Sequence, residues 1–317
     1  MADLPPTELL RVGQRTLQGL ILATAFFTAG CFSHQYRSRP RVTFVDGDPI
    51  VQMKTADAFR AVVKPSLVDP RQHSDPPDAD SRVLGLAVGA VPRAYPIGLL
   101  DRFEVVNDAV PGLPFVIARC ALIGVAAIYD RRAGGHVLEF RNSGTLWRDG
   151  LVLRDRETGT YWSAATGLAL YGPLAGERLR PVPAVLARVS AWERVFPGSL
   201  YMDLDRDTSV PLLMRLYRAS RWQGLSGQRT ADSRHRPKET VFTVAENDEA
   251  LAFTAGEIEA AGRLDTAIHG EPVSIRWDAA LSAPRAWGPD GTEKALVPMF
   301  WFAADRHFTH LTTLNER

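Results

Sequence analysis

Two stretches of this chain resemble each other, and that repetition constrains the fold more than any single motif does. Residues 83–118 align without gaps on residues 241–276, at a constant offset of 158 positions. Eight of the 36 aligned positions are identical, whereas average composition gives about two by chance. The identical pairs are Val83/Val241, Ala87/Ala245, Ala94/Ala252, Gly98/Gly256, Ala109/Ala267, Gly112/Gly270, Pro114/Pro272 and Ile117/Ile275. The alignment predicts an internal duplication.

From residue 82 onward the sequence predicts short strands, because apolar runs alternate with glycine and proline turns. We expect a hairpin over residues 83–96 and one helical turn over residues 97–102. The best amphipathic helix candidate covers residues 184–196, because Val185, Val189 and Trp192 fall on one helical face. The sequence therefore predicts an α+β, predominantly β fold of two related β-rich units, the first enlarged by residues 130–205.

The N-terminus reads as an export signal. Arg11 and Arg15 precede an apolar stretch, residues 17–29, that is short for a membrane span. It closes on Thr28-Ala29-Gly30-Cys31, which is similar to a bacterial lipobox, so Cys31 is the predicted lipidation site. An uncleaved signal anchor or a chance cysteine are the alternatives. We expect an extracytoplasmic protein, anchored to the bacterial cell envelope on the periplasmic face, with the membrane as partner through lipid on Cys31.

These features divide the chain into five parts. They are a lipoprotein-like signal peptide (1–30), a tether and N-terminal segment (31–80), a first β-rich unit with the candidate site (81–205), a basic connector (206–238) and a second β-rich unit (239–317).

Charge excludes one class of partner. The chain has 37 Lys+Arg against 36 Asp+Glu, a net charge of +1, so it has no global field to attract nucleic acid or an anionic membrane surface. The basic connector is the local exception. A short helix is expected at 210–217, and Arg215, Arg218 and Arg221 lie in or near it. These arginines either bind an acidic partner or are solvated. Composition favours the solvated reading.

No strong catalytic signature occurs in the sequence: there is no phosphate-binding glycine loop, no Gly-x-Ser-x-Gly, no His-Glu-x-x-His and no dinucleotide-binding fingerprint. His307 and His310 follow Asp305 closely enough to form half of a metal site on a helix, although surface or capping histidines are commoner. No cofactor is identified by any motif.

Four motifs carry a family resemblance: Arg93-Ala-Tyr-Pro, Val105-Val-Asn-Asp, the run Arg119 to Asp130, and Asp155-Arg-Glu-Thr-Gly-Thr-Tyr-Trp-Ser. Together they resemble the uncharacterised prokaryotic family catalogued as domain of unknown function 3179, over roughly residues 60–317. The resemblance implies no activity. It does imply a cluster of polar residues within apolar strands, with Cys120, Asp108, Asp130 and Asp155 as candidate catalytic groups and Tyr95, Asn107, Arg131, Arg156, Trp162 and Ser163 as candidate binding groups.

Two departures from the family pattern concern this cluster. Family members typically show Cys-Pro-Leu-Cys where this chain has Cys120-Ala-Leu-Ile123, and losing the second cysteine removes disulfide cycling and two-thiolate metal ligation. Trp162-Ser163 is followed by Ala164 instead of glutamine. Cys120 is therefore either a buried, inert residue or a single thiolate, a metal-ligand candidate whose pKa Arg119 or Arg131 would lower.

Two functions remain open from the sequence. One is a binding or structural domain for a small-molecule ligand or an envelope protein, with an exposed groove lined by Tyr95, Trp147, Trp162 and Tyr171. The other is a thiol- or metal-dependent enzyme or metal-binding protein centred on Cys120, which requires Asp108, Asp130 and Asp155 to converge with Cys120 in one cleft. For each aspartate, the sequence favours a turn-forming role over a catalytic one.

Overall fold

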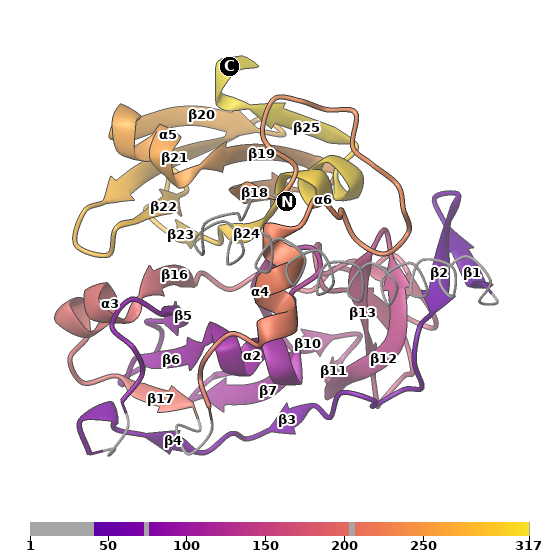
Figure 1. Ribbon diagram of the computed structural model, residues 1–317, viewed down its shortest axis with the longest axis horizontal. Coiled ribbons are helices and arrows are strands. Elements are labelled where there is room, and N and C mark those ends of the chain that lie inside the picture. Colours follow the sequence, from indigo (N-terminus) through magenta and orange to yellow (C-terminus); the bar gives the residue numbers. More distant parts are fainter. Residues whose placement is uncertain (1–40, 73–75, 203–206, 317) are drawn as a thin grey trace, which may run out of the picture.

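Strands dominate the structure, a computed structural model that describes residues 41–72, 76–202 and 207–316 (Figure 1). Cys31 and the apolar stretch 17–29 lie outside the described residues. No helix within the described ranges is long and apolar enough to cross a bilayer.

The first unit, which forms the lower half of Figure 1, is built on two sheets, with strand orders β16-β5-β6-β17-β4 and β3-β7-β8-β9. Its elements are β3 (Val62–Val63), β4 (Leu67–Val68), η1 (Pro70–Gln72), β5 (Arg82–Leu86), β6 (Arg93–Pro96), α2 (Ile97–Phe103), β7 (Val105–Val110), β8 (Leu113–Cys120), β9 (Val125–Asp130), β16 (Val185–Arg188), α3 (Val189–Val195) and β17 (Leu200–Met202). The expected hairpin over 83–96 and helical turn over 97–102 are confirmed by β5, β6 and α2.

The second unit also has two sheets, with strand orders β24-β18-β19-β25 and β20-β21-β22-β23. Its elements are β18 (Thr240–Glu246), β19 (Glu249–Thr254), α5 (Ala255–Ala261), β20 (Arg263–Ile268), β21 (Glu271–Asp278), β22 (Ala283–Trp287), β23 (Glu293–Lys294), β24 (Val297–Phe300), α6 (Trp301–His307), β25 (His310–Thr313) and η2 (Leu314–Glu316). Thr254 and Glu257 form a capping box that fixes the start of α5.

The same order of elements occurs in both units. Helix α2 begins at Ile97 and α5 at Ala255, and β7 begins at Val105 and β20 at Arg263, which is the spacing of the aligned sequences. In each unit a later strand pairs antiparallel with the first strand, a short helix follows, and a last strand pairs parallel with the second strand. The two units therefore share strand topology as well as sequence.

The first unit carries a large addition between β9 and β16, where the second unit has only β23 between β22 and β24. The addition contains β10 (Arg132–Ala133), β11 (His136–Val137), β12 (Phe140–Trp147), β13 (Gly150–Asp155), β14 (Tyr161–Ser163) and β15 (Ala169–Tyr171). Strands β1 (Arg41–Val45) and β2 (Asp48–Gln52) complete a six-stranded sheet of order β1-β2-β12-β13-β14-β15.

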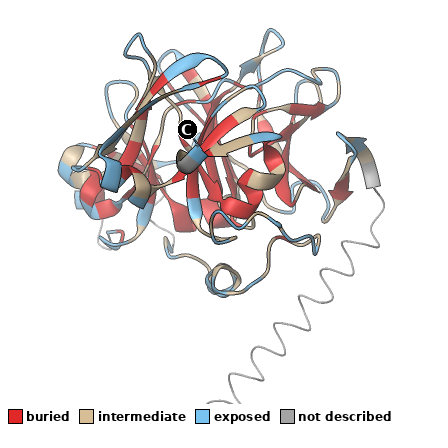
Figure 2. Cartoon of the chain, turned by 90° about the horizontal axis from the view of Figure 1, so that it is seen from above, coloured by how far each residue is buried: buried red, intermediate tan, exposed pale blue. Residues whose placement is uncertain are grey.

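One hydrophobic cluster joins the three parts of the molecule. It contains Trp162 from the addition, Val116 from the first unit and Trp301 from the second, all fully buried. In Figure 2 the buried residues occupy the centre of the molecule, and the turns around them are exposed. The polar candidates are thus set in a core that the units share.

The single helix expected over residues 184–196 is wrong. Residues 185–188 form β16, which pairs antiparallel with β5, and only the following seven residues form α3. Val185 and Ala187 are buried while Arg188 is exposed, so the burial has the period of a strand. Residues 185–188 form a strand because they pair with the edge of β5, about a hundred residues earlier in the chain. Local periodicity does not reveal a partner at that distance.

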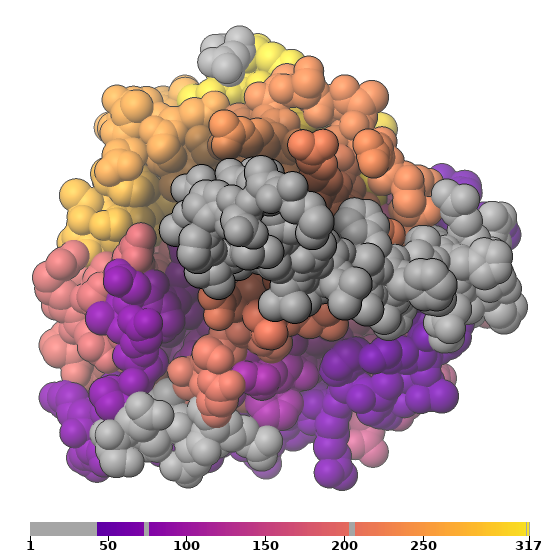
Figure 3. All heavy atoms as spheres, viewed as in Figure 1, coloured from indigo at the N-terminus to yellow at the C-terminus, as the bar shows by residue number. Residues whose placement is uncertain are grey.

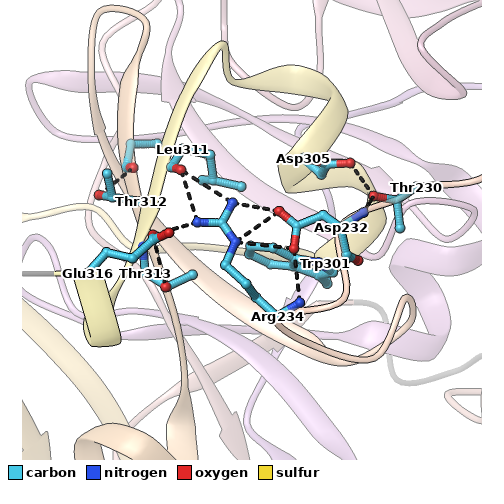
Figure 4. Close-up of polar contacts among 10 residues, drawn as sticks. Thr230, Asp232, Arg234, Trp301, Asp305, Leu311, Thr312, Thr313 and Glu316 are labelled. Atoms are coloured by element: carbon cyan, nitrogen blue, oxygen red, sulfur yellow. Dashed lines mark hydrogen bonds and ion pairs between the residues drawn. The ribbon is translucent and has the colours of Figure 1, made fainter.

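The basic connector crosses the face between the units (Figure 3) and contains α4 (Leu212–Ala219), close to the helix expected at 210–217. Figure 4 shows how its end is fastened to the second unit. The Arg234 guanidinium pairs with Asp232 at 2.6 Å and with Glu316 at 2.5 Å, and it lies 5.1 Å from the Trp301 ring centroid. Some basic charge of the connector is therefore used within the chain.

Candidate functional site

Asp108 and Asp130 lie in one row across the sheet β7-β8-β9, because both pair with Phe115 of the central strand. Tyr95 Oη donates to Asp108 Oδ2 at 2.6 Å, and Arg93 Nη1 donates to the same oxygen at 2.6 Å. Burial, and then the charge of Asp108, raise the pKa of Tyr95 above its usual range. Tyr95 is therefore a neutral donor that holds the Asp108 carboxylate.

Asp130 is held by two arginines at the end of β9. Arg132 Nη2 and Arg180 Nη2 lie 2.6 and 2.8 Å from Asp130 Oδ2. Burial would raise the pKa of Asp130, but the hydrogen bonds from Arg132 and Arg180 outweigh it and lower the pKa to about 2. A carboxylate that keeps its charge so firmly is a poor proton donor near neutral pH.

Asn107 and Asp155 organise the neighbouring sheet of the addition. Asn107 exchanges two hydrogen bonds with the backbone of Phe140. Asp155, which is fully buried, accepts from the backbone amides of Thr158, Gly159 and Thr160 and from Trp162 Nε1 at 2.8 Å. This is the turn-forming role that the sequence offered for Asp155.

The remaining candidate binding residues are used in the same way. Arg131 Nη1 donates to the backbone oxygen of Leu138, and exposed Arg156 pairs with Glu139 at 2.7 Å. Ser163 is buried and its Oγ accepts from the amide of Thr166 at 3.3 Å. Each side chain thus has a partner within the chain.

Cys120 lies at the other end of β8, five residues from Phe115 and hence about 17 Å along the strand from the row of aspartates. It is 2% exposed. Burial, followed by the charge of Glu104, raises the pKa of the Cys120 thiol to about 11. The expected lowering of this pKa by Arg119 or Arg131 is wrong, because Arg119 Nε pairs with buried Asp101 at 2.8 Å and burial dominates.

The expected convergence of Cys120 with the three aspartates in one cleft is therefore wrong. Within the described ranges, no group of three His, Cys, Asp or Glu residues has an arrangement that would hold a metal ion. The expected aromatic groove is also wrong, because Tyr95, Trp147 and Trp162 are at most 2% exposed and only Tyr171 is exposed. Strand order separates residues that the sequence motifs group together.

Glu104, which the sequence did not single out, lies beside Cys120. It is the C-cap of α2 with φ of 62°, and its Oε2 accepts from Asn142 Nδ2. Burial raises the pKa of Glu104 to about 7. The C-cap of α5 is Gly262, with φ of 70°, so a comparison of the two aligned segments could have shown that a glutamate occupies a left-handed position.

Asp149 is a second buried acid that the sequence did not reveal. It accepts from the amides of Leu225 and Ser226, both at 2.7 Å, and pairs with Arg306 at 2.6 Å. Asp149 thereby fastens the basic connector to the β12–β13 turn and to α6. The tripeptide Arg148-Asp149-Gly150 looks like an ordinary hairpin turn in sequence, so nothing there indicates this role.

A hollow of about 160 Å³ lies where turns of two sheets meet the end of α6. We call it the His307 hollow, and its lining includes Asp46, Trp147, Arg148, Arg178, Asp248 and His307. Arg148 pairs with Asp48 at 2.7 Å and lies 3.8 Å from Asp46, and Arg178 pairs with Asp248 at 2.6 Å. Two arginines and two aspartates of the lining thus balance each other in charge.

His307 is 6% exposed and both of its ring nitrogens are buried; neither makes a hydrogen bond of good geometry among the described residues, and the backbone of Arg148 is the polar group that lies close to the ring. Its ring meets the Trp147 ring edge to face at 5.4 Å. Burial, and then the charges of Arg148 and Arg306, lower the pKa of His307 to about 3, so the imidazole is neutral. The half metal site with His310, the less favoured alternative, does not form, because α6 ends at His307 and His310 belongs to β25, where it is exposed.

Comparison with known proteins agrees with the motifs. No curated protein and no solved structure matches the chain significantly. A family model, described as a protein of unknown function (DUF3179), matches residues 56–314, most of the described chain. The chain therefore belongs to the family of domain of unknown function 3179.

Proposed function

We propose that this protein is a lipid-anchored extracytoplasmic binding protein, and that its ligand occupies the His307 hollow. The export signal and Cys31 support the location. The polar candidates support binding over catalysis at Cys120, because each aspartate has structural partners and the Cys120 thiol is buried and protonated. The shared element order supports an internal duplication, in which the first unit gained the addition that supplies much of the hollow.

The observation that carries ligand binding is the buried imidazole of His307 in the lining of the hollow, whose ring nitrogens make no hydrogen bond of good geometry among the described residues. A buried polar group without a hydrogen bond costs about 1–3 kcal/mol, and such a group is generally tolerated where it serves a purpose. A neutral imidazole carries one donor and one acceptor, and we infer that a rotation of the His307 ring brings them to a molecule in the hollow, because both nitrogens are buried as the ring stands.

The charge of the lining limits the ligand class. Arg148 and Arg178 are each opposed by an aspartate at the rim, so the described lining offers both signs and no net charge. A volume of about 160 Å³ is below the roughly 300 Å³ at which pockets for drug-sized molecules begin. We therefore assign a compact polar molecule without net charge, with one hydrogen-bond acceptor and one donor for His307.

A thermal-shift screen with uncharged and zwitterionic polar compounds tests the assignment. A ligand at 100 times its Kd stabilises the fold by about 2.7 kcal/mol, and the shift should disappear in His307→Leu. His310→Leu is the matched control, because His310 is exposed three residues later and should keep the shift. A shift that survives in His307→Leu, or a screen in which no such compound stabilises the protein, contradicts the assignment.

A second candidate function, acid–base chemistry at Glu104, is favoured by its backbone conformation. A left-handed conformation costs a residue other than glycine about 1–2 kcal/mol, and such strain is concentrated at functional sites. If Glu104 is kept for chemistry, Glu104→Gly should raise the free energy of unfolding in urea by about 1 kcal/mol. A lower stability of Glu104→Gly would show that Glu104 is present for its stabilising hydrogen bond with Asn142.

A further inference from the structure

Helix α4 turns Tyr217 and Arg218 toward the rest of the chain and a face of three leucines outward. Leu212, Leu213 and Leu216 are 66%, 65% and 45% exposed, and no residue of the helix is buried. At 100° per residue these three leucines share one face. A surface helix of a globular protein normally turns its apolar stripe toward the core, so this orientation is the reverse of what folding alone favours.

The inward face explains how α4 is held in this orientation. Tyr217 Oη donates to the backbone oxygen of Leu122 at 2.7 Å, and the Lys238 ammonium lies 3.6 Å from the Tyr217 ring centroid. Arg218 Nη2 pairs at 2.8 Å with Asp101, whose side chain is fully buried. These contacts come from the first unit and from the end of the connector, so they fix the direction in which the leucines point.

Basic residues lie near the exposed leucines in the chain. Arg215 lies on α4 itself, and Arg221 and Arg229 follow in the connector; all three are exposed. Figure 1 shows α4 in the middle of the view, where the two units meet. An outward face of leucines flanked by arginines is the pattern of helices that lie in the interface of an anionic membrane.

The chain itself keeps this helix near a membrane if Cys31 carries lipid. Nine residues lie between Cys31 and Arg41, where the described structure begins, and these ten steps of the chain span at most about 35 Å when extended. The anchor would hold the folded domain within that distance of the lipid headgroups, which raises the effective concentration of any weak membrane contact. Each arginine near an anionic surface adds about 1 kcal/mol.

We propose that the outward face of α4, formed by Leu212, Leu213 and Leu216 with Arg215 and Arg221, docks on an anionic lipid bilayer and sets the orientation of the domain on the membrane. The proposal rests on the proposed function only for the lipid anchor. Three apolar side chains without a lipid bind weakly, so anchor and helix act together as the two signals that stable attachment requires.

Vesicle flotation tests the surface in a Cys31→Ser background, where lipid on the protein contributes nothing. The background protein should float with phosphatidylglycerol vesicles at low salt and far less with phosphatidylcholine vesicles. Replacing Leu212, Leu213 and Leu216 with serine should lower the bound fraction about tenfold. Arg215→Gln with Arg221→Gln should weaken binding and flatten its dependence on salt concentration.

Val137→Ser is the matched control, because Val137 is 52% exposed on the distant hairpin β10–β11 and its loss should leave flotation unchanged. Equal flotation of the triple-serine variant, or no flotation of the background protein, overturns the proposal. A dimer in light scattering that the same serines abolish would assign the surface to a second copy of the chain instead. Palmitate labelling of Cys31 in the wild type tests the anchor separately, so failure of the anchor and failure of the surface give different results.

Discussion

The side-chain amide of Asn107 replaces a backbone partner for Phe140, 33 residues later, by bonding both its N–H at 2.8 Å and its C=O at 2.7 Å. This pair joins the sheet β3-β7-β8-β9 to the sheet of the addition. Both residues are at most 1% exposed, so water cannot take over either bond.

Asn107→Ala should therefore lower the free energy of unfolding by about 2–4 kcal/mol, because two buried backbone groups lose their partners. Urea denaturation measures the loss. Asp265→Ala is the control at the aligned position of the second unit, where the side chain is exposed and pairs with Arg263; it should change stability by less than about 0.5 kcal/mol. Similar losses for the two variants would contradict a special role for Asn107.

Two aligned glycines should respond oppositely to alanine. A Cβ on Gly98 would lie 1.9 Å from the backbone oxygen of Thr208, whereas a Cβ on Gly256 would meet nothing within 4 Å. Gly98→Ala should destabilise the fold by several kcal/mol, since backbone must move. Gly256→Ala should stabilise α5 by up to about 1 kcal/mol. Thermal unfolding measures the stability of both variants. A destabilised Gly256→Ala would contradict the prediction that a Cβ at this position meets no other atom.

Glu104 and His307 should give opposite pH dependences of stability that cancel in the wild type. Burial raises the pKa of Glu104 from 4.5 to about 7, so the native state binds the extra proton between these values and stability falls as pH rises. Burial lowers the pKa of His307 from 6.5 to about 3, so the unfolded state binds the extra proton and stability falls as pH falls.

Each slope is about 1.4 kcal/mol per pH unit, and the two intervals overlap between pH 4.5 and 6.5. In that interval Glu104→Gln should become more stable with rising pH and His307→Leu less stable, relative to the wild type. Urea unfolding at pH 4.5, 5.5 and 6.5 measures both slopes. Curves parallel to that of the wild type would show that neither group has the shifted pKa.

Cys120 should be unreactive in the folded protein. A pKa raised from 9.0 to about 11 reduces the thiolate fraction at neutral pH about 100-fold, and burial adds a steric barrier. In a Cys31→Ser background, where Cys120 is the remaining cysteine, maleimide labelling should be slow in buffer and fast in 6 M urea. Rapid labelling of the native protein would restore the thiol-enzyme hypothesis.

Local sequence predicted those parts of the fold that neighbouring residues decide. The hairpin β5–β6 and the Asp155 turn are examples, because glycine, proline and aspartate specify turns over four or five residues. The strand β16 was missed because its partner β5 lies a hundred residues away. The candidate site was grouped too broadly for a similar reason: Cys120 and Asp108 belong to adjacent strands, but the antiparallel register places them at opposite ends.

The late pairing of β16 with β5 also sets the order in which the chain can fold. Strand β5 ends at Leu86, but the strand that pairs with its open edge begins at Val185. Strand β2 likewise pairs with β12, which follows much later in the chain. During synthesis about a hundred residues emerge before that edge is closed, and exposed strand edges are sites of aggregation. Such distant pairings slow folding. During this interval, protection of the first unit by a chaperone would decide the yield of folded protein. The second unit pairs its corresponding strand edge within about sixty residues.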